Sequence, residues 1–567
     1  MHNKVILFIS FFSIVYIGFK GEIYSQSKNE FISICGRITN SSSEFDKVGN
    51  TYCLMEFSYP DSVWLNNEYS FDLLSKQGNR IDLKSLILFK VDQKSNKSTN
   101  LHIYGVITSG GAVKVDNSGN IFIAFNSFSD TIRIEDSIYI NSEYKGGFIM
   151  LKLDNKFAIS KIFVIPNFFA GKIKMEISQN SIILSDDYAG YPKIINYNLS
   201  CYPPSPHHHN SFICSLKKDL DSVNYLVNFD GFGENDIYGF AVDSDQNIFF
   251  SGTSTAKTLQ INGENFNFPN SKYGAWFFIG KINNLGQLEW LSRTGCSAGD
   301  ALNSITLTDH KSLLITGTFF TTKLFFDNNT IENPNYPRPS SFLLELNKDG
   351  ELLKIKSYSK NGSLLLRGIQ TNENQKNFAI FTAIDTLFDE SGKSYYNKPY
   401  RNFVCELNDN WDIVTANYFN SNDDGDILTF TKNPNGRLFY SLLYFGDSLF
   451  HNGTLSFDIN EHNYLRIKYL LISVDVLSSN SKAYNKPSEI KIYPNPSFGE
   501  LNIVLPKDLI SKEIGFKIYN IEGVEISVKT EIFNSEFKIV GLPKGVYYIK
   551  VFFKNSIALT NKFIVLD

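Results

Sequence analysis

Short apolar runs recur along the whole chain, and Gly, Asn and Asp separate them about every 8–12 residues. No stretch keeps the 3.6-residue period of an amphipathic helix. The aromatic content of 15% and the hydrophobic content of 43% are sufficient for a packed core. The pattern therefore predicts an all-β protein, and the 567 residues allow two or more domains.

Three segments share one order of elements: a strand, an Asn/Gly-type turn, a second strand, a variable hairpin, and an apolar strand rich in Phe. The clearest copies run over 237–253 with 275–283, 303–318 with 341–350, and 111–124 with 147–154. Weaker copies fill the gaps, which places turns near residues 50, 120, 180, 247, 312, 377 and 436. These copies resemble the bacterial β-propeller repeat of exported proteins. The seven turns predict a seven-bladed β-propeller over residues 27–477.

The ends of this region fit a closed ring. One blade cannot cover both faces of its sheet, so neighbouring blades must pack against it. Residues 31–38 are expected to pair with the last blade, which removes exposed strand edges. Residues 478–489 are rich in Ser, Asn and Lys and contain Pro487, which predicts a linker.

The last segment, residues 490–567, alternates apolar and polar positions in short runs typical of an Ig-like β-sandwich with about seven strands. Pro494 and Pro496 restrict their stretch to an edge or a turn. Gly523 and Gly545 suit turns with positive φ. A plain Ig-like accessory module is the alternative interpretation.

Four motifs occur in order in this segment: 490–501, 518–523, 541–551 and 561–565. They resemble the type A C-terminal sorting domain of the type IX secretion system of Bacteroidota. The resemblance implies recognition by the type IX translocon and cleavage by a sortase, with release or attachment to surface lipopolysaccharide left open. The matching motif residues are Pro494, Asn495, Pro496, Gly499, Gly523, Gly541, Gly545, Tyr547 and Lys562.

The N-terminus has the pattern of a signal peptide. Lys4 precedes an apolar run over residues 5–19, which is shorter than the roughly 20 residues of a spanning helix. Cleavage after Ser25 gives a signal peptide over residues 1–25, and an uncleaved anchor is the alternative. Together with the C-terminal segment, this predicts transport through Sec and then across the outer membrane, to the cell surface or the medium.

The sequence contains no His-Glu-x-x-His, Gly-x-Ser-x-Gly, P-loop or dinucleotide motif. We therefore expect no catalytic residue, cofactor or metal ligand. His207, His208 and His209 follow a Pro-rich stretch, and an exposed loop tip is favoured over a metal site. The segment 243–247 resembles the start of a calcium loop, but Ile248 and Ser254 replace its Gly and Glu, so hairpin-turn chemistry is favoured.

Six Asp-Ser/Thr-aliphatic triplets resemble the O-glycosylation acceptor of Bacteroidota. The acceptor residues are Ser62, Thr131, Ser137, Ser222, Thr386 and Ser448. The alternative is structural, with each Asp capping a turn. The six cysteines give no connectivity.

Two functions remain for the propeller. A non-catalytic module that binds a glycan or protein ligand is favoured, because the axis-facing segments 300–303 and 423–426 show acids without a His or Arg cluster. The alternative is a secreted hydrolase or lyase with its active site on the propeller axis. The net charge of −4 and the lack of a basic block argue against nucleic acid as a partner.

Overall fold

The computed structural model describes most of the chain as strands and turns. The described residues are 4–7, 31–36, 38–57, 62–65, 69–72, 85–92, 98–104, 111–127, 131–134, 137–140, 147–166, 173–199, 201, 208–268, 274–297, 300–308, 312–326, 329–333, 336–358, 364–383, 387–388, 394–395, 401–421, 425–445, 448–451, 454–458, 467–473, 491–493, 497, 500–504, 514–520, 525–526, 529–533, 536–553 and 556–566. Over this described part no helix occurs, so none is long and apolar enough to span a membrane. The expected all-β class is confirmed.

Seven sheets in the described residues share one antiparallel core of four strands, and in six of them these strands follow chain order. The first strands are β3 Ile38–Phe45, β9 Gly111–Val115, β15 Lys174–Ile177, β21 Asn235–Val242, β27 Ala301–Leu307, β33 Leu364–Thr371 and β39 Gly425–Lys432. The second strands are β4 Thr51–Phe57, β10 Ile121–Ser127, β16 Ser181–Tyr188, β22 Ile248–Ser254, β28 Leu313–Phe319, β34 Asn377–Ala383 and β40 Leu438–Phe445. The third strands are β7 Ser85–Val91, β13 Gly147–Leu153, β19 Asn210–Lys217, β25 Gly274–Ile282, β31 Ser340–Leu346, β37 Arg401–Leu407 and β43 Ile467–Ser473. The fourth strands are β8 Ser98–Tyr104, β14 Ile159–Pro166, β20 Val223–Asp230, β26 Leu288–Ser297, β32 Leu352–Ser357, β38 Ile413–Ser421 and, from the start of the chain, β2 Phe31–Gly36.

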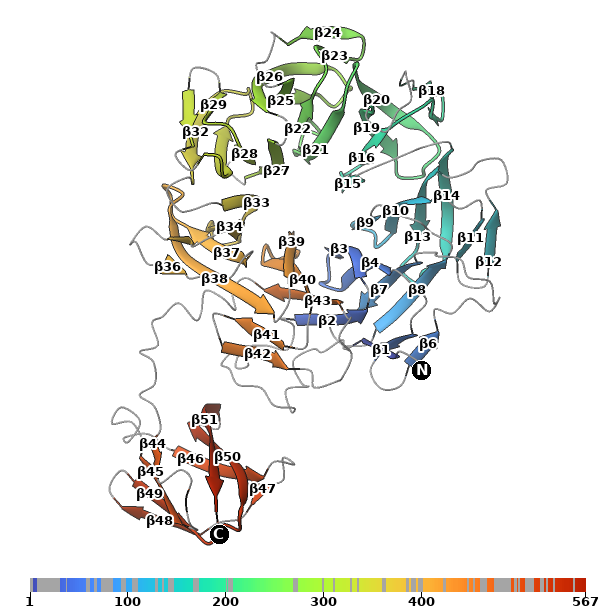
Figure 1. The fold of residues 1–567 in the computed structure, drawn as a ribbon. Coiled ribbons are helices and arrows are strands. Elements are labelled where there is room, and N and C mark those ends of the chain that lie inside the picture. The colour runs from blue at the N-terminus through green and yellow to red at the C-terminus, as the bar shows by residue number, and fades with distance from the viewer. Residues whose placement is uncertain are drawn as a thin grey trace. The chain divides into compact units, whose positions relative to one another are not determined.

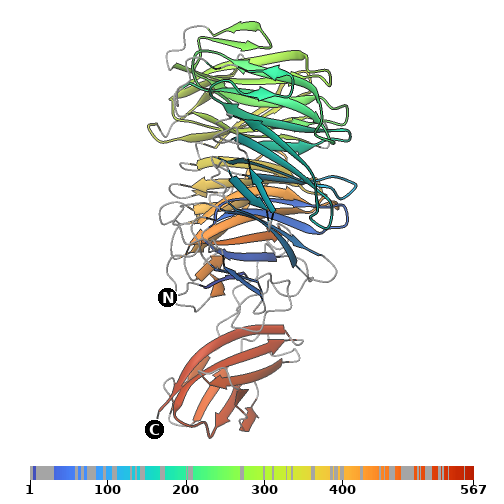
Figure 2. The same cartoon turned by 90° about the vertical axis from the view of Figure 1, so that its right-hand side faces the viewer.

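The first strands contact one another in a closed circle, β3–β9–β15–β21–β27–β33–β39 and back to β3. Figure 1 shows the sheets around a central opening, and Figure 2 shows the same sheets edge-on. The N-terminal strand β2 completes the last sheet by pairing with β43, from Phe31 opposite Ile472 to Gly36 opposite Ile467. The expected ring closure is therefore confirmed. Ser43 Oγ and Thr431 Oγ1, 2.9 Å apart, join the first and last innermost strands.

One turn is repeated between the first and second strands. In the sheet of β21, Asp243 Oδ1 accepts hydrogen bonds from the N–H groups of Asp245 and Asn247, both at 2.9 Å. Gln246, the residue between them, has φ 68°. The same pattern of an Asx oxygen and a positive-φ residue three positions later recurs at Asp46, Asp116, Asn372 and Asn433. Backbone hydrogen bonds close turns at all seven predicted anchors.

A two-stranded hairpin lies between the second and third strands of each sheet, where the sequence predicted a variable hairpin. The hairpins are β5 Ser62–Leu65 with β6 Tyr69–Asp72, β11 Thr131–Ile134 with β12 Ser137–Ile140, β17 Lys193–Ile194 with β18 Tyr197–Asn198, β23 Thr258–Ile261 with β24 Glu264–Asn267, β29 Lys323–Phe326 with β30 Asn329–Glu332, β35 Leu387–Phe388 with β36 Ser394–Tyr395, and β41 Ser448–His451 with β42 Thr454–Asp458. Strands β11 and β23 pair with β8 and β20, the fourth strands of the preceding sheets. These hairpins cover sheet edges that would otherwise expose unpaired backbone groups.

Aromatic side chains pack between neighbouring sheets. Phe229 of β20 lies 5.0 Å from Phe250 and 6.0 Å from Phe278, both in the next sheet. Phe277 of that sheet lies 6.0 Å from Phe342 of β31. All five rings are almost fully buried. Rings on the third strands β25 and β31 therefore take part in the packing between sheets.

The second compact unit contains the C-terminal sandwich, drawn in red in Figure 1. One sheet orders β44 Lys491–Tyr493, β45 Glu500–Val504, β49 Glu536–Val540 and β48 Lys529–Phe533. The other orders β47 Glu525–Ile526, β46 Ile514–Asn520, β50 Gly545–Phe553 and β51 Ser556–Val565. Two backbone hydrogen bonds tie Ser497 to Ile564 and Leu566. The described strands thus form two sheets of four, one strand more than the approximate seven predicted.

One turn expectation for this unit is wrong. Gly541 has φ 81°, whereas Gly545 opens strand β50 without a positive φ. Gly545 is instead a close-approach position, since a Cβ there would lie 3.2 Å from the ring of Tyr547. The Tyr547 hydroxyl donates to the Pro543 carbonyl at 2.8 Å, and Lys562 pairs with Tyr548 in the β50–β51 ladder. Pro494, Asn495, Pro496, Gly499 and Gly523 lie outside the described residues, as do the linker 478–489 and all of residues 1–25 except β1 Lys4–Leu7, which pairs with β5.

Candidate ligand site at the central channel

The central opening of the ring is a channel of about 500 Å³ lined mainly by the seven first strands. Five of these strands carry a register shift typical of a β-bulge, among them β21, β27 and β33. The residues at these three shifts are Tyr238, Asn303 and Arg367, and all three line the channel. A β-bulge re-aims a side chain at the point where strand pairing is interrupted. The repeated bulge therefore places different polar groups at equivalent positions of the channel wall.

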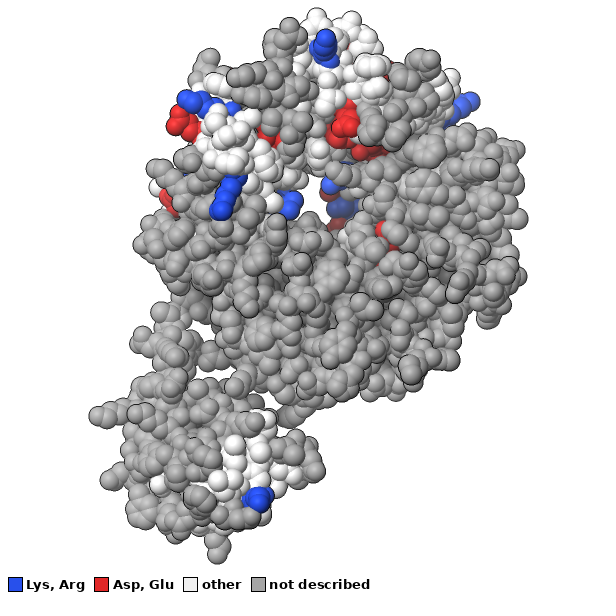
Figure 3. All heavy atoms as spheres, viewed as in Figure 1, with Lys and Arg blue, Asp and Glu red and all other residues white. Residues whose placement is uncertain are grey.

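Charged groups meet on one side of the channel. Lys114 of β9 forms ion pairs with Glu44 of β3 at 2.8 Å and with Glu176 of β15 at 3.0 Å. Burial raises the pKa of Glu44, and attraction to Lys114 offsets only part of that effect. Burial opposes the charge of Lys114, but the two glutamates outweigh it and raise the Lys114 pKa. Figure 3 shows basic and acidic side chains at the rim of the opening.

A second polar cluster lies where three chain segments reach the start of β21. It comprises Asp187 from β16, His209 immediately before β19, and Asp236 from β21. Their possible ligand atoms all lie within 4.8 Å of one another. His209 Nε2 is 2.6 Å from Asp236 Oδ1. Asp236 precedes the channel-lining Tyr238 by two residues, which places the cluster beside the channel wall.

Backbone and side-chain hydrogen bonds hold the three segments in place. The Asn235 N–H donates to the His209 carbonyl at 3.0 Å, and His209 forms a β-bridge with Glu234. The Ser211 hydroxyl lies within hydrogen-bond distance of both Asp187 Oδ1, at 2.9 Å, and the Asn235 carbonyl. Asp187 is buried, whereas the side chains of His209 and Asp236 have 24% and 19% of their surface exposed to solvent. The cluster is therefore positioned by strand ends and still reaches solvent.

The charges of the cluster raise the pKa values of His209 and of the adjacent Tyr238. The hydrogen bond to Asp236 raises the pKa of His209, burial opposes that effect, and the negative charges of Asp236, Asp187 and Glu234 reinforce it. Burial and then the charge of Asp236 raise the pKa of Tyr238 to about 12. The Tyr238 phenol therefore stays protonated at neutral pH and acts as a hydrogen-bond donor, 3.5 Å from Asp236 Oδ2.

The expectation for the three consecutive histidines is wrong at His209. It is not at an exposed loop tip, because the β-bridge and the Asp236 contact hold it at the edge of the sheet. His208 packs on the exposed ring of Phe232, with ring centroids 4.4 Å apart. His207 lies outside the described residues. Sequence reasoning missed the cluster because its two acids come from segments far along the chain from the histidine.

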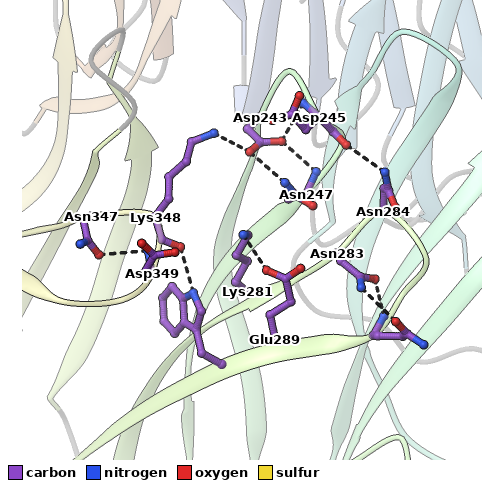
Figure 4. Close-up of polar contacts among 12 residues, drawn as sticks. Asp243, Asp245, Asn247, Lys281, Asn283, Asn284, Glu289, Asn347, Lys348 and Asp349 are labelled. Atoms are coloured by element: carbon purple, nitrogen blue, oxygen red, sulfur yellow. Dashed lines mark hydrogen bonds and ion pairs between the residues drawn. The ribbon is translucent and has the colours of Figure 1, made fainter.

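The calcium-like segment is a hairpin turn, as expected. Besides its two backbone donors, Asp243 accepts hydrogen bonds from Asn247 Nδ2 at 3.1 Å and from Lys348 Nζ at 2.6 Å. Burial opposes ionisation of Asp243, but the Lys348 and Asn247 donors outweigh it and lower the Asp243 pKa. Figure 4 shows Lys348 reaching this turn from the neighbouring sheet. The carboxylate is therefore used to join two sheets.

Trp290, on the fourth strand β26, also contacts the turn that contains Lys348, between β31 and β32 of the next sheet. Trp290 Nε1 of β26 donates to the Lys348 carbonyl at 3.0 Å. A Cβ at Gly350, in the same turn with φ 87°, would lie 2.9 Å from the Trp290 ring. Tyr225 of β20 covers Gly286 in the same way, one sheet earlier. These contacts form a second repeated feature at the turn end of the ring.

The structure places the other candidates apart from the cluster. Ser62, Thr131, Ser137 and Ser448 each begin a strand of an outer hairpin, while Ser222 precedes β20 and Thr386 lies outside the described residues. Asp221 forms an ion pair with Lys161 of the preceding sheet. The N–H of Asp221 donates to Asp219 Oδ1. Asp300 is buried and accepts the Phe320 N–H at 2.7 Å. Cys53, Cys201, Cys214 and Cys405 are buried free thiols.

Comparison with known families identifies the C-terminal segment. Residues 491–566 match the model of the secretion system C-terminal sorting domain. The chain thus carries a type IX sorting domain, which implies interaction with the type IX secretion machinery and a secreted or cell-surface location. No curated protein matches the chain.

Solved structures give only distant likenesses. A polysaccharide lyase, Uly1, is 10% identical over 75% of this chain and 88% of its own, with a TM-score of 0.39. A eukaryotic initiation factor is 7% identical over 69% and 87%, with a TM-score of 0.31. The extracellular domain of a hybrid two-component system from B. thetaiotaomicron is 10% identical over 91% and 90%, with a TM-score of 0.18. These low scores carry no argument about function.

Proposed function

We propose that this exported protein uses its ring as a non-catalytic binding module that takes a glycan or protein ligand at the end of the channel near Asp236. The observation that carries the proposal is the convergence of Asp187, His209 and Asp236 beside the channel-lining Tyr238. Two acids and an imidazole on fixed strand ends offer preorganised hydrogen-bonding groups for a polar ligand. The neighbouring Phe232 has 70% of its surface exposed and supplies an apolar face on which a sugar ring or an apolar side chain can stack.

A secreted hydrolase or lyase is the second candidate. The 2.6 Å hydrogen bond between His209 and Asp236, with Tyr238 nearby, is an arrangement that general acid–base chemistry uses. The exposed ring of Phe232, which packs on His208, favours binding, because a stacking surface serves ligand recognition and takes no part in proton transfer.

The test of binding is a screen of the untagged full-length chain against soluble polysaccharides and surface proteins of the host. For each hit, Arg367→Gln removes one of the positive charges that line the channel, and Lys257→Gln removes an exposed charge outside it. We expect Arg367→Gln to weaken binding at least tenfold and Lys257→Gln to leave it unchanged. Equal binding by both variants would contradict a channel site, and breakdown of a bound polysaccharide would favour the enzyme.

We also propose the details of export. Residues 1–25 act as a signal peptide for Sec, residues 27–477 form the ring, residues 478–489 form a linker, and a sortase removes the sorting domain before release or attachment to surface lipopolysaccharide. The match of residues 491–566 to the sorting domain supports the C-terminal part of this route. In the native host, a chain ending at Glu489 should stay in the periplasm as a folded ring. Normal appearance of that chain at the surface or in the medium would contradict the proposal.

A further inference from the structure

We propose that Asp187, His209 and Asp236 bind a divalent transition-metal cation of the Zn²⁺ or Mn²⁺ class. The inference rests on the proposed function, because this cation site lies at the end of the channel where we place the ligand. The donor set is one imidazole nitrogen and two carboxylates from three separate segments. Such mixed nitrogen and oxygen donors suit borderline first-row cations.

The spacing of the donor atoms fits a small cation. Zn²⁺ holds its nitrogen and oxygen ligands at about 2.0–2.2 Å in tetrahedral geometry, so two ligand atoms lie about 3.4 Å apart. The present donors lie within 4.8 Å of one another, and the closest pair, His209 Nε2 and Asp236 Oδ1, is 2.6 Å apart. A cation therefore needs the His209–Asp236 pair to open by about 1 Å and the widest pair to close by up to about 1.4 Å, which side-chain rotation can supply.

The supporting contacts fix the donors before a cation arrives. The Ser211 hydroxyl lies 2.9 Å from Asp187 Oδ1 and fixes the position of this carboxylate. The Asn235 side chain anchors the loop that precedes Asp236, by donating to Asn210 Oδ1 at 2.9 Å and to the Gly231 carbonyl at 3.1 Å. Ser254 donates to Asn235 Oδ1 at 2.6 Å. Such second contacts orient metal ligands and tune affinity.

The composition of the cluster selects the class of cation. Two carboxylates and a neutral imidazole carry a charge of −2, which a divalent cation neutralises. Ca²⁺ prefers six to eight oxygen ligands, which the three residues do not supply. With three protein ligands and partial exposure of His209 and Asp236, the cation keeps positions for water or for an oxygen of the ligand. The cation thus connects the ring to a polar group of the ligand.

Isothermal titration calorimetry of the untagged, chelator-treated full-length chain with ZnCl₂ and MnCl₂ tests the site. We expect one strong site per chain for at least one of the two cations. Asp236→Asn should weaken that site at least tenfold while keeping the shape of the side chain. Asp245→Asn, which removes an exposed carboxylate near the other end of β21, should bind like the wild type. His208→Gln separates the cluster from adventitious binding by the neighbouring histidine and should also bind like the wild type.

A spectroscopic measurement covers the case in which a variant folds poorly. Co²⁺ added to the wild-type chain should give visible absorption bands that excess Zn²⁺ removes, and Ser211→Ala should weaken Co²⁺ binding several-fold. Absence of any strong site in the wild type, or equal affinity in Asp236→Asn, would overturn the proposal. If the chelator-treated chain still binds the ligand, the cation has no role in ligand binding, whereas the proposed binding function stands.

Discussion

The two ends of strand β21 use the same residue types for different purposes. At one end, Asp243 accepts four hydrogen bonds and joins two sheets. At the other end, Asp236 faces His209 and Asp187 beside the channel. The Asp243 arrangement recurs as an Asx turn around the ring. By contrast, Ala301 takes the equivalent position of Asp236 in the next sheet, two residues before the bulge.

This contrast separates structure from function within one chain. A feature that every repeat needs, such as a closed turn, must reappear in every repeat. A ligand site on the axis needs its full set of residues only once: the position of Asp236 is Ala301 and Leu365 in the next two sheets and an acid again, Asp426, in the last sheet. We therefore assign the turn end of β21 to stability and the Asp236 end to binding, and the Asp243→Ala and Asp236→Asn variants test that assignment.

The largest effect is expected at the repeated end. Asp243→Ala removes an acceptor of four hydrogen bonds and leaves the Lys348 ammonium without this partner, which should lower the free energy of unfolding by about 4 kcal/mol. Chemical denaturation followed by tryptophan fluorescence measures the change. Asp245→Asn, an exposed acid in the same turn, is the control and should stay within about 0.5 kcal/mol. A small effect of Asp243→Ala would remove the structural role of the turn.

The second prediction compares two histidines. Burial lowers the pKa of His102 in β8 to about 4, whereas the hydrogen bond to Asp236 raises that of His209. Because unfolded His102 takes up a proton near pH 6.5 and the folded form does not, stability is fully present above pH 6.5 and falls as the pH drops toward 4. The loss should reach roughly 3 kcal/mol near pH 4.5. Unfolding curves recorded above pH 6.5 and near pH 4.5 should show that His102→Gln loses less stability on acidification than the wild type. A pH dependence equal to that of the wild type would contradict this prediction.

The third prediction uses a matched pair of glycines. Gly350 has φ 87°, and a Cβ added to it would lie 2.9 Å from the Trp290 ring. Gly263 has φ 86°, and a Cβ added to it would meet nothing within 4 Å. Both alanine variants should lose about 1 kcal/mol to backbone strain. Gly350→Ala should lose about 1–2 kcal/mol more, because the Trp290 ring must shift. Equal thermal midpoints for the two variants would show that the contact between sheets is loose.

The smallest effect is expected at the binding end. Asp236→Asn keeps the size of the side chain and removes a charge from a partly exposed cluster, so the free energy of unfolding should change by less than about 1 kcal/mol. The same denaturation assay measures it. A loss as large as that of Asp243→Ala would place the cluster among the structural features of the ring and contradict our assignment.

Most of the ring could be predicted from the sequence because its turns depend on local chemistry. An Asx residue followed three positions later by Gly, as at Asp116 and Gly119, marks a turn without knowledge of distant residues. The closure by β2 also followed, because an unpaired edge must be covered. Both inferences use groups that are close in sequence or a rule that holds for any sheet.

The candidate site could not be predicted in the same way. His209 lies 27 residues from Asp236, and they meet only because β19 and β21 belong to adjacent sheets of the ring. The three consecutive histidines drew attention to the right segment, but no local pattern pairs that segment with Asp187. Asp236 by itself was no signal, because the equivalent position is Ala301 and Leu365 in the next two sheets but again an acid, Asp426, in the last sheet.

The most direct test of the contrast is an anomalous diffraction map of crystals of the full-length chain soaked in ZnCl₂, recorded at the zinc absorption edge. Our account predicts a peak among Asp187, His209 and Asp236 and none at the Asp243 turn, where the carboxylate already accepts four hydrogen bonds. A peak at the Asp243 turn, or density at neither end of β21, would contradict it.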